Sequence, residues 1–155
     1  MTRPRVAAWL AAHAPDLRVI DQGSSTATVA EAAVELGVEP GRIAKTLAFR
    51  VGETVMVVIA RGDARLDNGK CKAELGGRPR MLDAEETLAV TGHAVGGVCP
   101  FALASPVPVL ADRSLLAFET VFPAAGSRTS SVEAAPLRLA ALTAARWVDI
   151  CRLPD

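Results

Sequence analysis

The densest run of residues that could support chemistry lies at positions 91–101, where three glycines and a proline fall among apolar residues. Glycine lets the chain turn sharply and lets a ligand come close to the main chain, while proline restricts the turn. Amides left free in such a loop can hold an anion or the oxyanion of a reacting carbonyl group. The sequence therefore predicts an oxyanion-binding loop, with a plain connecting turn as the alternative.

Lys45 is the second candidate, because it falls in a segment that is otherwise apolar on one face. Residues 43–51 alternate as a β-strand does, so Lys45 shares a face with Leu47 and Phe49. Burying an unpaired ammonium group is costly. The side chain must therefore reach water at the strand end, pair with a carboxylate, or line a cavity that receives a ligand.

The cysteines and histidines are weaker candidates for catalysis or metal binding. Cys99 could serve as a nucleophile only with a base beside it, and His13 and His93 are the two histidines of the chain. Cys71, Cys99 and Cys151 are widely spaced and form no C-x-x-C pair, so neither a disulfide framework nor a zinc site is indicated. We expect no metal centre and no cofactor.

Helix and strand signals place these residues in a mixed fold. Segments 43–51 and 54–61 indicate a β-hairpin that turns at Gly52. Thr28 and Asp83 each begin a capping box, and Gly37 and Gly92 end the helices that follow. The other predicted helices are 4–13, 68–75 with Asn68 as its cap, and 136–142; the other predicted strands are 17–20, 80–82, 107–111, 117–122, 129–133 and 147–150. This order predicts an α+β domain in which short helices decorate a curved, barrel-like, mostly antiparallel sheet.

Length and composition bound the remaining classes. With 155 residues and no formal net charge, the chain fits one domain spanning 1–155. Its apolar runs are too short for a membrane span and its N-terminal segment does not fit a signal peptide, so we expect a cytoplasmic protein. Positions 61–80 carry six basic and three acidic residues. This bias is local, and the neutral composition argues against DNA or other broad nucleic-acid binding.

Four segments together resemble the YbaK family, the free-standing relatives of the editing domain inserted in bacterial prolyl-tRNA synthetases. They are TVAEAAVEL at 28–36, RIAKTLAFR at 42–50, GHAVGGVCPF at 92–101 and AGSRTSSV at 125–132. The resemblance runs from about residue 24 to residue 150. It implies a YbaK-like fold and hydrolysis of wrongly charged aminoacyl-tRNA.

The resemblance also implies roles. Lys45 is similar to the family's functional lysine, which engages the aminoacyl-adenosine end of the tRNA. The segment 96–100 is similar to a G-x-x-x-P loop whose main chain contacts the aminoacyl carbonyl. Gly96 and Gly97 would then stabilise the oxyanion. The substrate-binding residues would be Leu47, Val98, Cys99, Pro100, Gly126 and Ser130.

Ser130 is the least direct of these assignments. Gly126 looks like the turn that brings a polar side chain into the family's pocket, where several relatives have His or Asp. This sequence has Thr129, Ser130 and Ser131 instead, which leaves an acid or base role unsupported. Alternation with the apolar Val132 favours Ser130 as the inward residue.

The expected function is trans-editing: deacylation of mischarged tRNA carrying a small amino acid, by attack of water with main-chain stabilisation of the oxyanion. The expected partner is the acceptor end of that tRNA, delivered alone or by a synthetase or other translation factor. Two alternatives stay open. One is a non-catalytic module that binds an aminoacyl group or nucleotide, and the other is a thiol-dependent esterase that uses Cys99.

Overall fold

A long β-hairpin forms the centre of the computed structural model, which describes residues 2–21 and 23–154, with side chains from residue 5 onward. Strands β2 (Ile43–Val51) and β3 (Thr54–Arg61) have the predicted bounds and turn at Gly52, whose φ is +60°. Positions 56–60 of β3 are buried in succession. Both faces of this strand are covered, which explains why its sequence is uniformly apolar rather than alternating.

The remaining elements are short. The helices are α1 (Thr2–His13), α2 (Val29–Leu36), α3 (Asn68–Leu75), α4 (Ala84–Thr91) and α5 (Pro136–Thr143), with 3₁₀ turns η1 (Pro40–Arg42) and η2 (Arg113–Ala117). The other strands are β1 (Ile20–Asp21), β4 (Arg65–Leu66), β5 (Arg80–Met81), β6 (Val109–Asp112), β7 (Phe122–Pro123), β8 (Ser130–Ser131), β9 (Arg146–Val148) and β10 (Cys151–Arg152).

The main sheet is mixed and open. Its strand order is β5-β2-β3-β6-β9, and β7 also pairs with β2. Two small pairs, β1 with β8 and β10 with β4, lie outside it. Across the described residues, four strand pairs are antiparallel and three are parallel. The α+β class and the mostly antiparallel pairing are confirmed, but the described strands do not close into a barrel.

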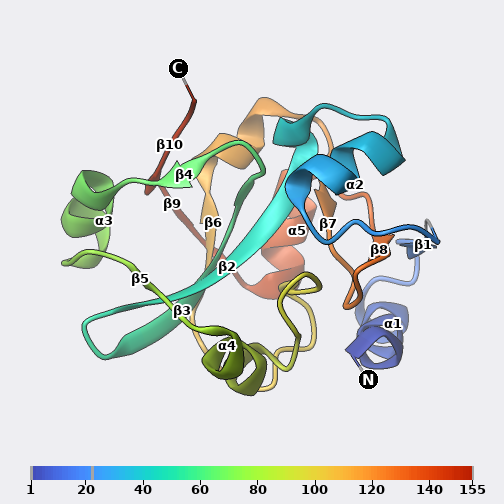
Figure 1. Cartoon of the computed structure of the whole chain (residues 1–155), viewed down its shortest axis with the longest axis horizontal. Helices are drawn as coiled ribbons and strands as arrows, with labels where there is room; N and C mark the ends of the chain where they lie inside the picture. The colour runs from blue at the N-terminus through green and yellow to red at the C-terminus, as the bar shows by residue number, and fades with distance from the viewer. Residues whose placement is uncertain (1, 22, 155) are drawn as a thin grey trace.

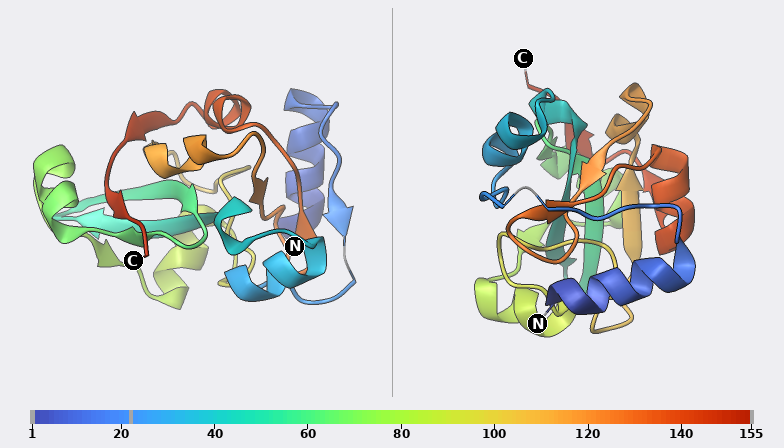
Figure 2. Two further views of the ribbon diagram at one scale, coloured as in Figure 1. Left: turned by 90° about the horizontal axis from the view of Figure 1, so that it is seen from above. Right: turned by 90° about the vertical axis from the view of Figure 1, so that its right-hand side faces the viewer.

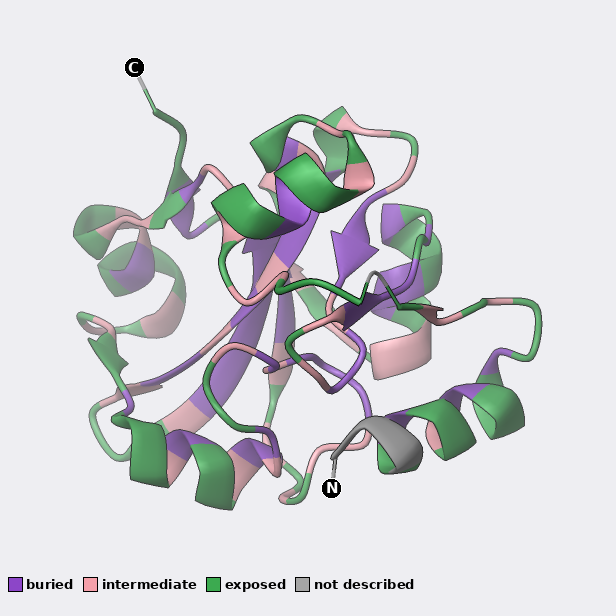
Figure 3. Cartoon of the chain, turned by 45° about the vertical axis from the view of Figure 1, so that its right-hand side comes forward, coloured by how far each residue is buried: buried purple, intermediate pink, exposed green. Residues whose placement is uncertain are grey.

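Helices cover both faces of the sheet. Figure 1 shows α2 and α4 in front of it, and Figure 2 places α5 and η2 on the opposite side. Figure 3 shows the central hairpin largely buried, while the helices expose one face each. No helix among residues 2–21 and 23–154 is long and apolar enough to cross a membrane.

Helix ends follow the sequence closely. Thr28 Oγ1 accepts the Glu31 amide and Asp83 Oδ1 accepts the Glu86 amide, as the capping boxes predict. Gly37 and Gly92 end α2 and α4 in the left-handed conformation. The cap of α3 is Asp67 rather than Asn68, because the Asp67 carboxylate reaches the amide of Lys70. An acceptor one residue earlier takes the capping role.

The largest errors of the prediction fall after α4. Segment 117–122 is not a strand, since η2 ends at Ala117 and only the short strand Phe122–Pro123 pairs with β2. Asp112 Oδ2 accepts the Ser114 amide and starts the 3₁₀ turn. The predicted strand 107–111 begins at Val109, directly after Pro108, and lies in the interior of the sheet. Pro106 and Pro108 both precede its paired residues, where they remove no hydrogen bond from the ladder.

Candidate functional site

A cavity of about 380 Å³ opens along one edge of β2, between α2 and α4. Its walls are largely apolar. Its lining residues include Lys45, Thr46, Leu47, Gly96, Val98 and Ser131. Apolar side chains of α2 close one side, namely Val29, Ala32 and Leu36. The cavity therefore joins β2 to the glycine loop and to the turn before β8, as the resemblance implied.

The edge of β2 is unpaired where it borders the cavity. Strand β7 pairs with β2 only at Ile43 and Ala44, and β5 pairs with it only at Phe49 and Arg50. Leu82 donates its amide to the Ala48 carbonyl on this edge. Because main-chain groups two residues apart in a strand point the same way, the amide and carbonyl of Thr46 face the cavity. The gap between β7 and β5 leaves them available to a ligand.

Lys45 lies partly buried on the face of β2 opposite to Thr46. Its ammonium group donates a hydrogen bond to the main-chain carbonyl of Ala64, and Lys45 is among the residues that line the cavity. Burial lowers the pKa of Lys45, while the nearby Asp63 carboxylate opposes that shift. Of the three outcomes that the sequence left open, the structure has the third: Lys45 lines a cavity, and a main-chain carbonyl holds its ammonium group.

Two hydroxyl groups in the cavity wall lack hydrogen-bond partners. Thr46 Oγ1 and Ser131 Oγ are buried, and neither bonds to any residue that the structure describes. Ser130, the serine favoured by the sequence, also lines the cavity, but its Oγ lies 2.6 Å from Ser127 Oγ. Buried polar groups in proteins are normally paired. Thr46 and Ser131 line the cavity, but both hydroxyl oxygens are buried within its wall, so a side-chain rotation would be needed to present either hydroxyl to a bound molecule.

The two glycines of the loop differ. Gly96 lines the cavity with φ of +95°, and a Cβ there would meet Ala27 at 3.2 Å. Within the described chain, the amides of Gly96 and Val98 donate to no acceptor. The Gly97 amide donates to the Ala94 carbonyl, 3.0 Å away. Gly96 and Val98 therefore offer free donors, whereas the Gly97 amide is occupied.

Cys99 is not activated. It is fully buried, and burial raises the pKa of its thiol to about 12. His93 Nε2 lies 3.5 Å from the sulfur but 2.8 Å from the Phe101 carbonyl oxygen. Since a carbonyl only accepts, Nε2 carries the hydrogen and cannot take the thiol proton. The geometry argues against a thiolate nucleophile.

Comparisons with known proteins place the chain in a family. The family model described as the aminoacyl-tRNA editing domain matches residues 24–142. The chain belongs to the aminoacyl-tRNA editing domain family. Uncharacterized protein YwhH of Bacillus subtilis strain 168 is 47% identical over 131 residues, which cover 83% of each chain. Membership confirms the resemblance to YbaK proteins and prolyl-tRNA synthetase editing domains.

Two further relatives define the extent of this editing domain. The proline–tRNA ligase of Thermotoga maritima is 36% identical over 89 residues, which are 57% of this chain but 15% of the ligase. A solved structure proposed to be a trans-editing enzyme for prolyl-tRNA synthetase superposes with a TM-score of 0.88 at 34% identity, covering 97% of this chain and 96% of the other. The chain thus spans a small part of the ligase and nearly all of the free-standing structure.

The editing domain brings together part of the residue set predicted from its sequence. Lys45, Leu47, Gly96, Val98 and Ser130 line the cavity. The other predicted residues, Gly97, Cys99, Pro100 and Gly126, are buried behind its lining. Gly97 packs against the main chain of Ser127, where a Cβ would meet backbone atoms at 3.2 Å. These four residues therefore support the loops around the cavity without lining it.

Sequence reasoning missed Thr46, Ser131 and the apolar residues of α2. Thr46 follows Lys45 directly. Its main-chain amide and carbonyl are unpaired because β5 and β7 each pair with only two residues of β2, and this can be recognised only when the strand register is known. The capping box predicted the helix α2, but not that its apolar residues face a cavity. Among the described residues, no group of three or more His, Cys, Asp or Glu side chains could hold a metal ion.

Proposed function

We propose that this editing domain acts in trans as a deacylase, hydrolysing the ester that joins a small amino acid to the terminal ribose of a mischarged tRNA. The observation that carries the proposal is the cavity on β2, where free loop amides, two unpartnered hydroxyls and a lysine meet between apolar walls. Buried polar groups in proteins are normally paired, so a concentration of unpaired groups beside one cavity favours a binding role for it.

The free amides suit the transition state of ester hydrolysis. Water adds to the ester carbonyl carbon, the carbonyl oxygen becomes an oxyanion, and the bond to the ribose oxygen then breaks as that oxygen gains a proton. Gly96 and Val98 supply amides near this oxygen, and the Thr46 amide faces the same space. One well-placed donor of this kind is typically worth about 10²–10³ in rate.

The hydroxyls and the lysine orient the substrate. Thr46 Oγ1 and Ser131 Oγ can each accept from the α-ammonium group or position the attacking water. The Lys45 ammonium adds positive charge at the wall, and its bond to Ala64 fixes its position. No side chain among the lining residues is poised as a strong base, so the reaction depends on positioning an already activated ester.

The size of the cavity favours a small amino acid. A volume of about 380 Å³ lies toward the low end of ligand pockets, which run from roughly 300 to 1,000 Å³, and the ribose must share it. A synthetase discriminates between amino acids that differ by one methylene by only about 10–200-fold. Smaller amino acids are therefore attached to the wrong tRNA at times, and a second site is needed to remove them. Alanine and serine are the expected substrates.

The test is a panel of tRNAs charged with noncognate amino acids and incubated with the purified protein, with Lys45→Met alongside. We expect the natural protein to release small amino acids and the variant to release them about 100-fold more slowly. Release of none would point to the binding module. A Cys99→Ala variant that loses the activity while staying folded would revive the thiol-dependent esterase, whereas we expect full activity.

A further inference from the structure

Two arginines face each other across the small β4–β10 pair, outside the cavity. The register places Arg152 directly opposite Arg65, and both side chains are exposed. Like charges in directly opposed positions destabilise a strand pair, because their Cβ atoms lie only about 4.5–5.5 Å apart. Within residues 2–21 and 23–154, neither guanidinium has an acidic partner. The pair therefore retains a positive charge that its neighbours do not neutralise.

The arginines line a cleft of about 320 Å³ together with Asp63, Leu153 and Pro154. Asp63 is the acidic residue among the described residues that line the cleft, and it already forms an ion pair with Arg61. Arg61 Nε lies 2.6 Å from Asp63 Oδ1, and its Nη2 lies 2.8 Å from Oδ2. This contact holds the pKa of Asp63 below its usual value. The cleft therefore presents two unmatched positive charges to solvent.

The cleft adjoins the wall of the candidate active site. Ala64 lies between Asp63 and Arg65 in the chain, and its carbonyl accepts the hydrogen bond from Lys45. The charge of Arg65 is one of the causes that lower the pKa of Lys45, which places the two cations near each other. Figure 1 shows β4 and β10 together, close to the C-terminus. Positively charged side chains thus lie both at the cavity, where Lys45 is, and in the neighbouring cleft, where Arg65 and Arg152 are.

We propose that Arg65 and Arg152 bind backbone phosphates of the tRNA acceptor strand whose 3′ end occupies the cavity. Arginine suits this role because its planar guanidinium group binds phosphate oxygens in a bidentate manner. The pair would hold the strand without reading its bases. This inference rests on the proposed function, since it assigns the phosphate contacts of the same substrate.

Direct binding tests the inference without relying on turnover. The probe is an uncharged RNA minihelix with a 3′ CCA end, titrated by fluorescence anisotropy at several salt concentrations. For the double variant R65Q/R152Q we expect binding at least about 10-fold weaker. The slope of log K against log salt should fall in magnitude by about 1.4–1.8, as two lost phosphate contacts predict.

The matched control is R113Q/R146Q, which removes the same charge from two other exposed arginines. We expect it to change the slope by less than half as much. The melting temperature of R65Q/R152Q should stay the same or rise, because a repulsive pair has been removed. Unchanged affinity and slope in R65Q/R152Q, or an equal loss in the control, would overturn the inference.

Turnover separates this inference from the proposed function. Alanyl-adenosine has the ester but no upstream phosphates, so R65Q/R152Q should hydrolyse it at the rate of the natural protein. If the natural protein hydrolyses neither this ester nor alanyl-tRNA, the proposed function is wrong, and the minihelix titration still decides the phosphate site. A loss of alanyl-adenosine hydrolysis equal to the loss on tRNA would contradict a phosphate role.

Discussion

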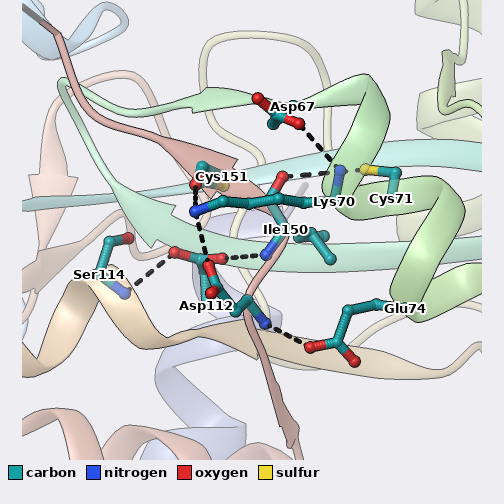
Figure 4. Close-up of polar contacts among 9 residues, drawn as sticks. Asp67, Lys70, Cys71, Glu74, Asp112, Ser114, Ile150 and Cys151 are labelled. Atoms are coloured by element: carbon teal, nitrogen blue, oxygen red, sulfur yellow. Dashed lines mark hydrogen bonds and ion pairs between the residues drawn. The ribbon is translucent and has the colours of Figure 1, made fainter.

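Two clusters of buried polar groups in this protein differ in how fully they are satisfied. Around Asp112, which is 1% exposed, one carboxylate oxygen accepts the Ile150 amide at 2.8 Å and the other accepts the Ser114 amide at 2.9 Å. Figure 4 shows this cluster, in which Lys70 also donates to the Cys151 carbonyl. In the cavity, by contrast, Thr46 and Ser131 keep unpartnered hydroxyls.

The contrast separates a structural role from a binding role. The Asp112 cluster ties β6, α3 and the C-terminal segment together, and each oxygen of its carboxylate is held by a main-chain amide. One of its hydroxyls, Ser114 Oγ, is also unpartnered, but Ser114 is not among the residues that line the cavity on β2. An unpartnered group therefore indicates a binding site only where space for a ligand adjoins it. The predictions below test that rule.

The largest effect should come from Asp112→Ala. It leaves one buried and one partly buried amide without acceptors, each costing about 1–3 kcal/mol, so the free energy of unfolding should fall by about 2–6 kcal/mol. Urea denaturation measures this, and deacylation per folded molecule should stay within about twofold. Asp149→Ala is the control, since its pair with Lys70 is exposed and should contribute about 1 kcal/mol or less. Equal losses in both variants would contradict the structural role.

Lys45→Met should have the opposite effect to Asp112→Ala, with a loss of activity and no loss of stability. We expect kcat/KM for deacylation to fall about 100-fold, which corresponds to about 2.7 kcal/mol of transition-state stabilisation. Burial lowers the pKa of Lys45, so the charged form is less favourable in the folded than in the unfolded state at neutral pH. The melting temperature should therefore hold or rise. A folded variant with full activity would remove Lys45 from the mechanism.

Thr46→Val and Ser131→Ala probe the unpartnered hydroxyls directly. Each removes a buried polar atom that has no partner in the folded protein, so stability should rise slightly. We expect kcat/KM to fall about 10-fold in each. Ser130→Ala is the matched control, because its hydroxyl is already bonded to Ser127. Activity loss confined to Ser130→Ala would show that the wrong serine was chosen.

The smallest effect concerns His93, whose Nδ1 is unpartnered but lies outside the cavity lining. Burial lowers the pKa of His93, so the unfolded chain takes up the proton first as the pH falls through about 6.5. Stability should drop by about 1 kcal/mol between pH 8 and pH 6, and His93→Gln should flatten that slope. Parallel slopes in thermal or urea unfolding would show that His93 does not titrate in this range.

Local signals in the sequence predicted the hairpin and several helix ends. β2 and β3 have the predicted bounds because their apolar pattern and the Gly52 turn act over short distances. The prediction of a strand over 117–122 failed because only Val121 and Phe122 of the segment are buried, and because η2, which starts from a cap at Asp112, extends to Ala117. The apolar residues of this segment resemble a strand in sequence.

The candidate site was predictable in position but not in detail. Lys45 and Gly96 could be chosen from residue type and spacing, and both line the cavity. The occupied Gly97 amide and the free Ser131 hydroxyl could not, because each depends on neighbours fixed by the folded loops. Whether a polar group is satisfied is a property of tertiary structure, so the sequence identified the loop but not its free donors.

The central claim is that the cavity on β2 is a hydrolytic site that selects small amino acids by exclusion. The most direct measurement compares kcat/KM for alanyl, prolyl and phenylalanyl esters on one tRNA, with the same protein preparation. We predict alanyl ester hydrolysis at least about 10-fold faster than prolyl, and still less action on phenylalanyl. Equal rates on all three esters would contradict the claim and would indicate a general esterase.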